Sequence, residues 1–431
     1  MSSQPTHAMD LARLPTHLQA TLAQAAALAN TQGAQLWLVG GIVRDLLLAD
    51  GFGSDVDLAV EGDALALAAA LGALPGGRVV ATHIAFGTAT VELPAPGGGR
   101  LVIDLARARA ERYPRPAALP EVRPAPIEED LARRDYSINA LAVELRAVGG
   151  ALAPGRTLDP FGGRADLAAR LLRLLHPASL RDDPTRILRG VRLAARLGLR
   201  LEPASQAQLE EARDAGYLSL LSAERVLDEL CLALAEPRPD AVLRLADTWG
   251  ITREILPGMH WSPELGERGE RLAASGGAGL PEGPLVWAGL IAYDLGVDEL
   301  RTLAARYPLP AQAANLLRQL PALRALAPSL ASRPPNSAIE RMLRPFAPEA
   351  TAVLHYAEPA AAPAVAHYFQ TLRHTRTLLD GNDLRRLGLA PGPALGRLLD
   401  ELRAATLDGV VATREEAEMW IRARLTTPGV A

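Results

Sequence analysis

Two stretches decide the fold of this chain: LVGGIVRD at residues 38–45 and GSDVDL at residues 53–58. The first begins with apolar, strand-forming residues and breaks at a glycine pair before a helical pattern starts. In the second, alternation along a strand puts Asp55 and Asp57 on one face, about 7 Å apart at Cα. Two carboxylates at this spacing suit divalent metal ions that also hold a triphosphate. We therefore predict a strand, a glycine turn and a helix, followed by an acidic strand.

The glycine pair, Gly40 and Gly41, would let backbone amides approach a phosphate closely at the start of a helix. Arg44 follows one turn into that helix and is expected to reach the same phosphates. Magnesium is a hard cation that prefers oxygen ligands, and this stretch offers carboxylates without a nearby His or Cys. We therefore expect Mg2+ as the cofactor, held by Asp55 and Asp57.

A further acidic residue, Asp104, stands inside the apolar run LVIDL at residues 101–105. A charge within an otherwise apolar strand favours a functional role, and a site of this kind normally has a third carboxylate on a neighbouring strand. Asp104 is therefore predicted to be catalytic. The alternative is a residue at the end of a strand that faces water.

The apolar pattern predicts a small mixed domain followed by helices. Short β-type runs occur at residues 36–39, 56–60, 88–93 and 101–105, with a helical segment at residues 64–74. A proline-rich, charged stretch at residues 113–126 is expected to be a mobile loop. Beyond residue 159 the pattern predicts one helix after another. We therefore expect an α+β fold with a head at residues 1–147, a helical neck at 148–236, a body at 237–365 and a tail at 366–431.

Composition limits the class of protein. The formal net charge is −4, so overall charge gives no sign of a nucleic-acid partner. All 45 basic residues are arginine, so contacts to phosphate must come from guanidinium groups. The single cysteine, Cys231, cannot form an internal disulfide, and its apolar surroundings predict burial. No stretch has the pattern of a signal peptide or a membrane span, so we expect a cytoplasmic protein without membrane contact.

The opening stretches together resemble the head domain of class II tRNA nucleotidyltransferases and bacterial poly(A) polymerases, in the polymerase-beta superfamily. The run EDLARRDYSINA also resembles the second motif of that family, which usually ends Arg-Arg-Asp-Phe-Thr-Ile-Asn-Ala. Tyr136 and Ser137 depart conservatively from that pattern. The resemblance implies that Arg134, Asp135 and Asn139 recognise the ribose and the triphosphate.

DDPTR at residues 182–186 resembles the Glu-Asp-x-x-Arg motif of the same family. The resemblance implies that Asp183 and Arg186 bind the Watson–Crick edge of the incoming base without a template. A carboxylate can accept from the exocyclic amine of C or A, and a guanidinium can donate to ring acceptors. Arginines then recur at helical spacing and predict one basic stripe, whose first three members are expected to bind nucleotide: Arg186, Arg189, Arg192, Arg196 and Arg200.

Three further stretches extend the resemblance along the chain. DPFGG at residues 159–163 is similar to the hinge between head and neck. ARAERYP at residues 108–114 resembles the flexible loop that helps such enzymes switch from C to A, which argues against a loop-deleted enzyme that adds only C. Residues 379–396 resemble the C-terminal region that holds tRNA. The implied architecture is a polymerase-beta-like head with a mixed β-sheet, followed by an all-α neck, body and tail.

The resemblance implies an enzyme that adds C and/or A to the 3′ end of tRNA from CTP and ATP by two-metal nucleotidyl transfer. One alternative is a specialised A-adding or CC-adding enzyme that works with a partner. Another is a poly(A) polymerase, although the chain lacks basic extensions. A different class, an inactive RNA-binding scaffold, is disfavoured because the metal carboxylates are retained together with Arg44, Arg134 and Asp183. The sequence makes no prediction of oligomeric state.

Overall fold

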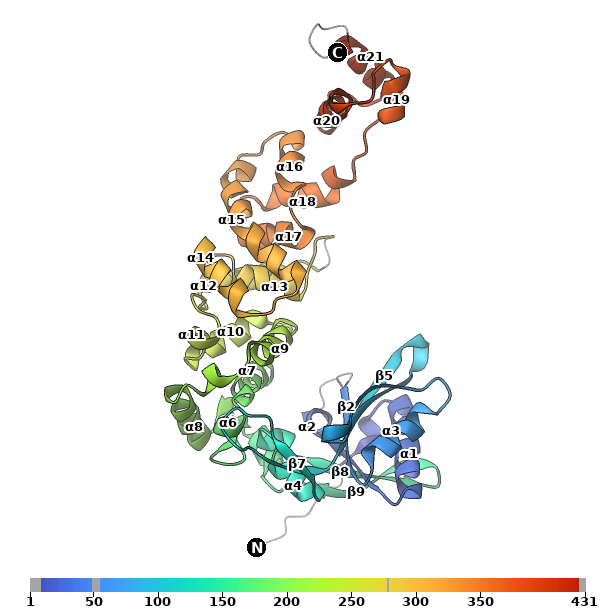
Figure 1. Cartoon of the computed structure of the whole chain (residues 1–431), viewed down its shortest axis with the longest axis vertical. Coiled ribbons are helices and arrows are strands. Elements are labelled where there is room, and N and C mark those ends of the chain that lie inside the picture. Colours follow the sequence, from blue (N-terminus) through green and yellow to red (C-terminus); the bar gives the residue numbers. More distant parts are fainter. Residues whose placement is uncertain (1–8, 49–54, 277–278, 426–431) are drawn as a thin grey trace. The chain divides into compact units, whose positions relative to one another are not determined.

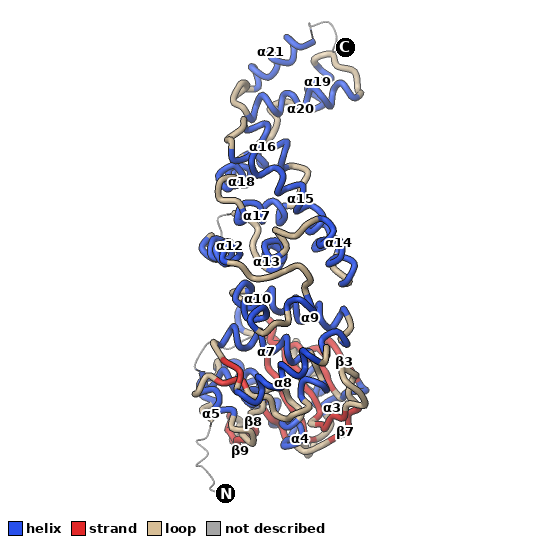
Figure 2. The backbone as a smooth tube through the Cα atoms, turned by 90° about the vertical axis from the view of Figure 1, so that its left-hand side faces the viewer, coloured by secondary structure: helices blue, strands red, loops and turns tan. Residues whose placement is uncertain are grey.

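The computed structural model describes residues 9–48, 55–276 and 279–425. The chain divides into two compact units, residues 1–222 and 223–431. Every strand of the described chain belongs to the first unit, and the second unit is helical (Figures 1 and 2). The predicted α+β fold, with a mixed sheet in the head followed by helices, is confirmed. No helix in the described ranges is long and apolar enough to span a membrane.

A seven-stranded sheet forms the centre of the first unit, in the order β3-β4-β5-β2-β1-β8-β9. β2 and β5 run parallel, and the other neighbours are antiparallel. The strands are β1 Gln35–Val39, β2 Asp55–Glu61, β3 Arg78–His83, β4 Thr88–Pro94, β5 Arg100–Arg107, β8 Ala142–Val148 and β9 Ala151–Leu158. Two smaller pairs are β6 Arg109–Arg112 with β7 Glu121–Pro124, and β10 Leu171–Leu172 with β11 Arg200–Leu201.

The four strands expected from apolar runs are β1, β2, β4 and β5. The strands β3, β8 and β9 were not predicted. β9 contains Pro154 and Gly155, which are typical of turns but are tolerated in an edge strand. The sheet therefore continues to Leu158, past residue 147. The division into head, neck, body and tail stays a prediction.

Both faces of the central strand β1 are buried, by different partners. Leu36 and Leu38 belong to a large apolar core with helices α1 Thr16–Thr31 and α3 Ala64–Gly72. These two helices lie side by side against one face of the sheet (Figure 1). Trp37 and Val39 point to the other face and pack with α4 Ile127–Ala132. The alternation fixes which face each neighbouring strand presents.

On β2 the same alternation directs the acidic residue toward the second face. Val56 and Leu58 are 1% exposed and belong to the core with α1 and α3. Because successive side chains of a strand point to opposite faces, Asp57 points away from that core. The burial of Val56 and Leu58 thus directs the Asp57 carboxylate to the other face of the sheet.

The edge strand β3 is exposed on both faces. Val79 and Val80 are 41% and 43% exposed. The pairing of β3 with β4 shifts register between Val79 and Ala81, which is a β-bulge or similar irregularity.

Helices complete the two units. The remaining helices of the first unit are α2 Gly41–Leu48, α5 Gly163–Ala168, α6 Ser179–Asp182, α7 Thr185–Leu197 and α8 Pro203–Asp214. Those of the second unit are α9 Ala223–Leu234, α10 Pro239–Thr248, α11 Thr252–Ile255, α12 Pro263–Ala274, α13 Pro284–Ile291, α14 Val297–Arg306, α15 Ala311–Ala331, α16 Asn336–Leu343, α17 Pro348–Ala357, α18 Ala362–Gln370, α19 Gly381–Arg386, α20 Pro393–Leu407 and α21 Arg414–Leu425. The last three share a small apolar core of their own.

The predicted burial of Cys231 is wrong. Cys231 lies on α9 and is exposed. Leu232, the next residue, is 47% exposed, whereas Val226 on the same helix is buried. Membership of an apolar run therefore does not place every residue on the buried face of a helix.

Leu38→Ala is expected to lower the free energy of unfolding by about 2–5 kcal/mol, because Leu38 is fully buried on β1 and its loss leaves a cavity. Urea unfolding followed by circular dichroism measures the change. Leu220→Ala is the matched control, since Leu220 is 54% exposed, and should cost roughly 0.5 kcal/mol or less. Equal losses in both variants would contradict this assignment of the core.

Candidate active site

Two acidic residues are paired on the face of the sheet away from α1 and α3. Asp57 of β2 is in register with Asp104 of β5, and Asp104 is in register with Thr90 of β4. The Thr90 hydroxyl donates to Asp104 Oδ1 at 2.5 Å and so orients that carboxylate. Asp57 and Asp104 are both exposed. Asp55 begins β2 two residues before Asp57, and its side chain lies outside the described part of the chain.

The turn between β1 and α2 brings backbone close to this acidic pair. Gly40 has a φ of +75°, and a Cβ there would lie 3.2 Å from both Asp57 Oδ2 and Arg134 Nη1. Only glycine meets both conditions without strain or displacement. Gly41 follows as the first residue of α2. The predicted strand, glycine turn and helix are therefore present, with the turn beside the acidic strand.

Arg44 is buried in α2 and does not line the cleft described below. Its Nη1 donates to Asn139 Oδ1 at 2.7 Å, and its guanidinium pairs with Asp45 at 2.7 Å. Asn139 in turn donates through Nδ2 to Asp135 Oδ1 at 3.2 Å. In the described contacts, Arg44 therefore positions the side chain of Asn139. The contact between Arg44 and a phosphate stays a prediction.

Asp130, which the sequence analysis did not single out, holds two arginines of the second motif. Its side chain is 1% exposed and pairs with Arg133 at 2.7 Å and with Arg134 at 3.0 Å. Burial alone would raise the pKa of Asp130, but the charges of Arg134 and Arg133 and their hydrogen bonds outweigh burial and lower it. The available sequence signal was an acid three and four residues before two arginines on a helix.

The base-reading candidates lie where α6 passes into α7. Asp183 Oδ1 accepts hydrogen bonds from Thr185, from the backbone N–H at 3.1 Å and from the hydroxyl at 2.6 Å. Arg186 is 4% exposed. Its Nη1 donates to Ser179 Oγ at 2.6 Å and its Nη2 donates to the carbonyl of Arg133 at 2.7 Å. Both side chains are thus held in one orientation.

The predicted arginine stripe is only partly a feature of one helix. Arg189 Nη2 lies 2.9 Å from Asp135 Oδ2, so that arginine pairs with the second motif. Arg192 is not among the residues that line the cleft. Arg200 lies on β11, because Gly198 with a φ of +62° ends α7. The prediction that all five arginines share a helix is therefore wrong for Arg200.

A hairpin formed by β6 and β7 carries a buried carboxylate that the sequence analysis also missed. The Glu111 side chain is 5% exposed and pairs with Arg109 at 2.9 Å and with Arg133 at 2.8 Å. The Tyr113 hydroxyl donates to Glu111 Oε2 at 2.8 Å. Burial, and then the Glu111 charge, raise the pKa of Tyr113, so its hydroxyl remains a donor at neutral pH.

The hairpin takes up part of the loop expected at residues 113–126, whose residues 113–120 connect its two strands. Residues 121–124 form β7, paired with β6. Within the connecting segment, the Ala117 N–H donates to the Arg181 carbonyl of α6 at 3.2 Å. The strands β6 and β7 were not predicted because this stretch of the chain is rich in charged residues and prolines. Ion pairs, rather than apolar packing, are the main contacts that hold their side chains.

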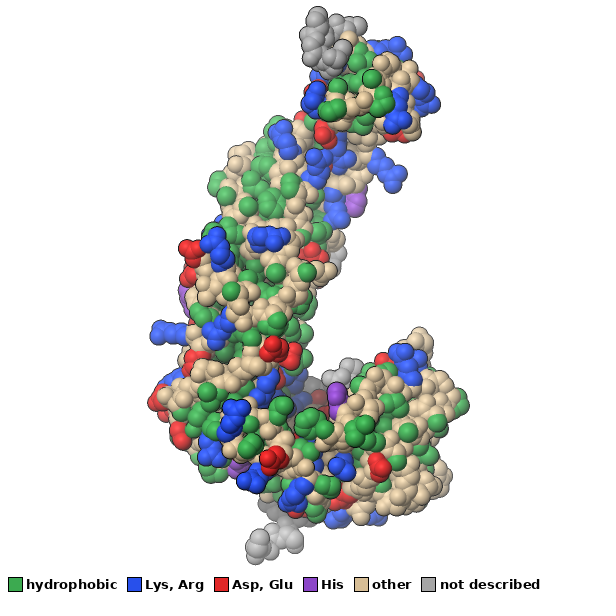
Figure 3. Space-filling model, viewed as in Figure 1, with side chains coloured by type: hydrophobic (Ala, Val, Ile, Leu, Met, Phe, Trp, Pro, Cys, Tyr) green, Lys and Arg blue, Asp and Glu red, His purple; other side chains and the backbone are tan. Residues whose placement is uncertain are grey.

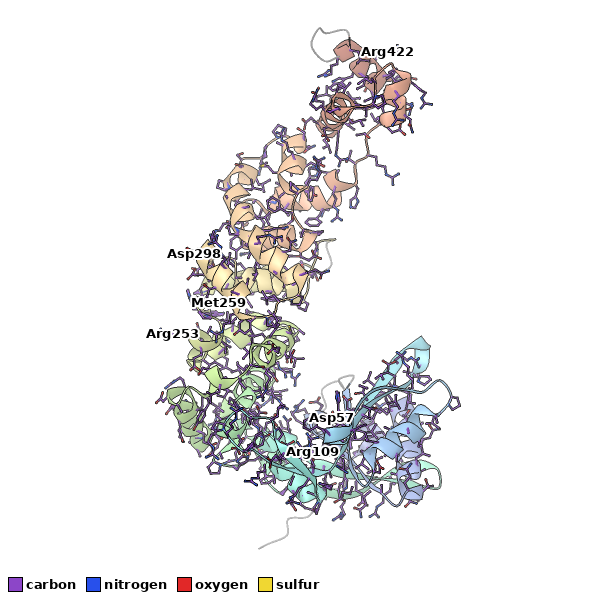
Figure 4. The ribbon with its side chains drawn as sticks, viewed as in Figure 1. Asp57, Arg109, Arg253, Met259, Asp298 and Arg422 are labelled. Atoms are coloured by element: carbon purple, nitrogen blue, oxygen red, sulfur yellow. The ribbon has the colours of Figure 1, made fainter. Side chains whose placement is uncertain are left out.

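Many of these groups line one cleft of about 740 Å³ in the first unit. Figure 4 labels Asp57 on β2 and Arg109 on β6, two of its walls. The predicted residues that line it are Gly40, Gly41, Asp57, Asp104, Arg134, Asp135, Asn139, Asp183, Arg186 and Arg189. The residues that were not predicted include His83, Phe86, Thr90, Arg109, Glu111 and Tyr113. The two predicted motifs and the acidic strand pair therefore face one space.

Comparison with known proteins gives the family. Residues 36–173 match the Poly A polymerase head domain, and residues 198–261 match the model described as Probable RNA and SrmB- binding site of polymerase A. A CC-adding tRNA nucleotidyltransferase of Deinococcus radiodurans is 36% identical over 393 residues, which cover 91% of this chain and 90% of that protein. The chain belongs to the class II tRNA nucleotidyltransferases.

Other members of this tRNA nucleotidyltransferase family are named for different activities. An A-adding enzyme of Halalkalibacterium halodurans is 31% identical over 391 residues, covering 90% of this chain and 88% of that protein. A Thermotoga maritima CCA-adding enzyme, solved in complex with tRNA-CCA, is 26% identical with a TM-score of 0.71, and covers 96% of this chain and 97% of its own. The family resemblance of the sequence motifs is confirmed.

Nucleotidyltransferases of this family generally use a divalent metal. The residues of this cleft fit such an ion, because Asp57 and Asp104 present carboxylate oxygens from directly paired positions. Within the described residues, no three acidic, histidine or cysteine side chains are grouped closely enough to hold a metal by themselves. Asp55 is the predicted further ligand.

Thr90→Val is expected to lower kcat/KM for nucleotide addition about tenfold. The substitution keeps the shape of the side chain but removes a hydrogen bond to a charged group, which is worth about 1.5–3 kcal/mol. Steady-state kinetics at several divalent-metal concentrations measure the effect. Thr90→Ser should restore most of the loss. Unchanged kinetics in the valine variant would refute the orienting role of Thr90.

Asp130→Asn is expected to lower the free energy of unfolding by about 3 kcal/mol at pH 7, because it uncouples two arginines from a buried carboxylate. The pKa of Asp130 is lowered from 3.8, so its contribution is fully present above about pH 4 and is lost as pH falls below that value. Urea unfolding at pH 7, 5 and 3.5 should show the difference between wild type and variant shrink only at pH 3.5. Asp214→Asn, at an exposed carboxylate, is the control. A difference that is the same at pH 7 and pH 3.5 would be inconsistent with this shift.

Proposed function

We propose that this chain is a template-independent enzyme that adds C and A residues to the 3′ end of tRNA from CTP and ATP. One observation carries the proposal. The acidic pair Asp57 and Asp104 and the base-reading candidates Asp183 and Arg186 line the same cleft. Transfer and base choice can therefore act on a single bound nucleotide. The relatives support tRNA as the acceptor, because they are named as tRNA nucleotidyltransferases or were solved with tRNA.

The proposed reaction is attack by the 3′-hydroxyl oxygen of the RNA on the α-phosphorus of the nucleotide, with release of pyrophosphate. Mg2+ held by Asp55 and Asp57 would supply positive charge that lowers the pKa of the hydroxyl and stabilises the leaving group. Arg134 and the amides of Gly40 and Gly41 are proposed to hold the triphosphate. Their place beside Asp57 supports this assignment, since Gly40 lies within contact of both Asp57 and Arg134.

The proposed sugar and base contacts follow from the rest of the cleft. Asp135 and Asn139 are proposed to bind the ribose, with Arg189 holding Asp135. Asp183 would accept from the exocyclic amine of C or A, and Arg186 would donate to a ring acceptor. Arg186 has five N–H donors. Its Nη1 donates to Ser179 Oγ and lies 3.4 Å from His176 Nε2, and its Nη2 donates to the Arg133 carbonyl, which leaves donors for a base. Arg192 stays a proposed contact further along α7.

The tail is proposed to hold tRNA phosphates. Figure 3 shows blue arginine side chains over the C-terminal helices. Within α19–α21 the exposed arginines are Arg385, Arg386, Arg397, Arg414 and Arg422. Asp383 pairs with two of them, Arg386 and Arg414, and orders them at the surface. Since tRNA is the proposed substrate, we place the enzyme in the cytoplasm.

A second candidate is an enzyme that adds only CC or only A and works with a partner. Two relatives that match most of the chain favour it, because one is a CC-adding and the other an A-adding enzyme. A poly(A) polymerase or an inactive scaffold has less support, since the acidic pair and the base-reading candidates are retained around one cleft.

Three tRNA transcripts distinguish these candidates: one ending before CCA, one after C and one after CC. The purified protein and Mg2+ are incubated with each transcript, with CTP and ATP offered separately and together. Addition of C, A or both at the expected stages is the predicted result, and products are separated on sequencing gels. Asp57→Asn should lose more than about 1000-fold in rate, because a metal ligand is removed. Asp214→Asn should retain the wild-type rate.

The pattern of products names the enzyme. Completion of CCA on all three transcripts identifies the full activity. Addition of A to the CC-ended transcript alone, or of CC alone, identifies a specialist. Long A tracts on unrelated RNA would identify a poly(A) polymerase instead. Folded protein that binds tRNA and incorporates nothing would refute the proposed catalytic role of Asp57.

A further inference from the structure

Tyr136 joins the second motif to the base-reading helix by a buried hydrogen bond. Its side chain is 1% exposed, and its hydroxyl donates to the main-chain carbonyl of Arg186 at 2.7 Å. The motif that Tyr136 belongs to usually has phenylalanine at this position, which has no hydroxyl to donate. A chain with phenylalanine at this position would lack the hydrogen bond.

Gly190 makes this contact possible. The residue four positions after Arg186 lies over the Arg186 carbonyl on the surface of α7. A Cβ on Gly190 would lie 2.0 Å from the Tyr136 hydroxyl oxygen and 2.8 Å from its Cζ. Any other residue would have to displace the ring, not merely its hydroxyl. Tyr136 and Gly190 therefore fit together as a pair, which we call the Tyr136–Gly190 lock.

Two side-chain contacts reinforce the lock on the same part of α7. Arg189 pairs with Asp135 at 2.9 Å, and Arg186 Nη2 donates to the Arg133 carbonyl at 2.7 Å. The first turns of α7 are thus bonded to three residues of the second motif, Arg133, Asp135 and Tyr136. The groups proposed to read the base cannot shift relative to those proposed to hold the ribose and triphosphate without breaking these contacts.

This constraint matters because cytosine and adenine differ in size. One is a single ring and the other is two fused rings, so the amine and the ring acceptor lie at different distances from the ribose. If Asp183 and Arg186 are fixed relative to the ribose site, they match the distance in one base better than the distance in the other. If these two side chains could shift, they would bind both bases, and the preference between CTP and ATP would be smaller.

We propose that the Tyr136–Gly190 lock is a positioning device that sets the discrimination between CTP and ATP. The proposal rests on the proposed function, since it assigns base reading to Asp183 and Arg186. Tyr136 does not touch the base in this account. It acts through the position of Arg186, and its hydroxyl is the group that fixes this position.

The test compares Tyr136→Phe with a matched control, Ser137→Ala. Ser137 is the next residue and is equally buried, but its hydroxyl donates to Asp166 Oδ2 of α5 at 2.6 Å, away from α7. Each variant therefore loses one buried hydroxyl. For each protein we would measure kcat/KM for CTP and for ATP on the same transcript, the equilibrium Kd of each nucleotide without RNA, and the melting temperature.

The expected result is that Tyr136→Phe reduces the preference between the two nucleotides roughly two- to tenfold, the range that one hydrogen bond supports. Ser137→Ala should leave that ratio unchanged although it lowers the melting temperature by a similar amount. Gly190→Ala should reduce the preference in the same direction and by more, because its Cβ displaces the ring.

Equal losses for CTP and ATP in Tyr136→Phe would overturn the proposal, as would an equal change of the ratio in Ser137→Ala. The nucleotide Kd values separate this inference from the proposed function. If the wild type binds nucleotides but transfers neither, the proposed function fails, and the ratio of Kd values still decides the role of the lock.

Discussion

Two carboxylates at directly paired positions of neighbouring strands repel each other, and the Asp57–Asp104 pair has this arrangement. A change in the pairing register of β2 and β5 would relieve this repulsion. The apolar packing on the opposite face of the sheet prevents such a change. A slip of one residue would turn Val56 and Leu58 out of the core with α1 and α3. The apolar core therefore holds an unfavourable charge arrangement in place, and a divalent cation would find it already formed.

The arginine side chains around the cleft are held by buried carboxylates. Asp130 holds Arg133 and Arg134, Glu111 holds Arg109 and again Arg133, and Asp135 holds Arg189. The planar guanidinium group suits this use, because its fork of donors can satisfy a carboxylate and still present N–H groups elsewhere. Side chains that are already ordered lose less entropy when a substrate binds. In this chain, which has no lysine, the proposed anion-binding surface thus consists of arginine side chains that are already held in position.

The sequence predicted those parts of the fold that alternate clearly or follow a motif. β1, β2, β4 and β5 were found because each has an apolar face, and the glycine turn was found because Gly40 has to adopt positive φ. β9 and the β6–β7 hairpin were missed, because Pro154 in the first and prolines and ion pairs in the second are typical of loops. Asp130 and Glu111 were missed for another reason. Their importance depends on which arginines the fold brings to them, and spacing alone does not encode that.

The same distinction applies to the residues of the candidate site. Periodicity put Arg186 and Arg189 on one helix, as the structure does, but it gave no sign that Arg186 is buried and bonded to Ser179. Arg44 was predicted from a motif, and its burial against Asn139 appears only in three dimensions. The catalytic and binding roles of these residues remain proposals. The structure adds their neighbours, which define what each substitution removes.

The bulged edge strand β3 bears on how the protein behaves at high concentration. An exposed strand edge with apolar side chains is a template on which another chain can pair and aggregate. The register shift between Val79 and Ala81 interrupts the regular row of backbone donors and acceptors and increases the local twist. Arg78 adds a charge, tied to Glu92 at 2.6 Å. The irregularity and the charge of Arg78 thus make this edge a poorer template for pairing than a regular apolar strand would be.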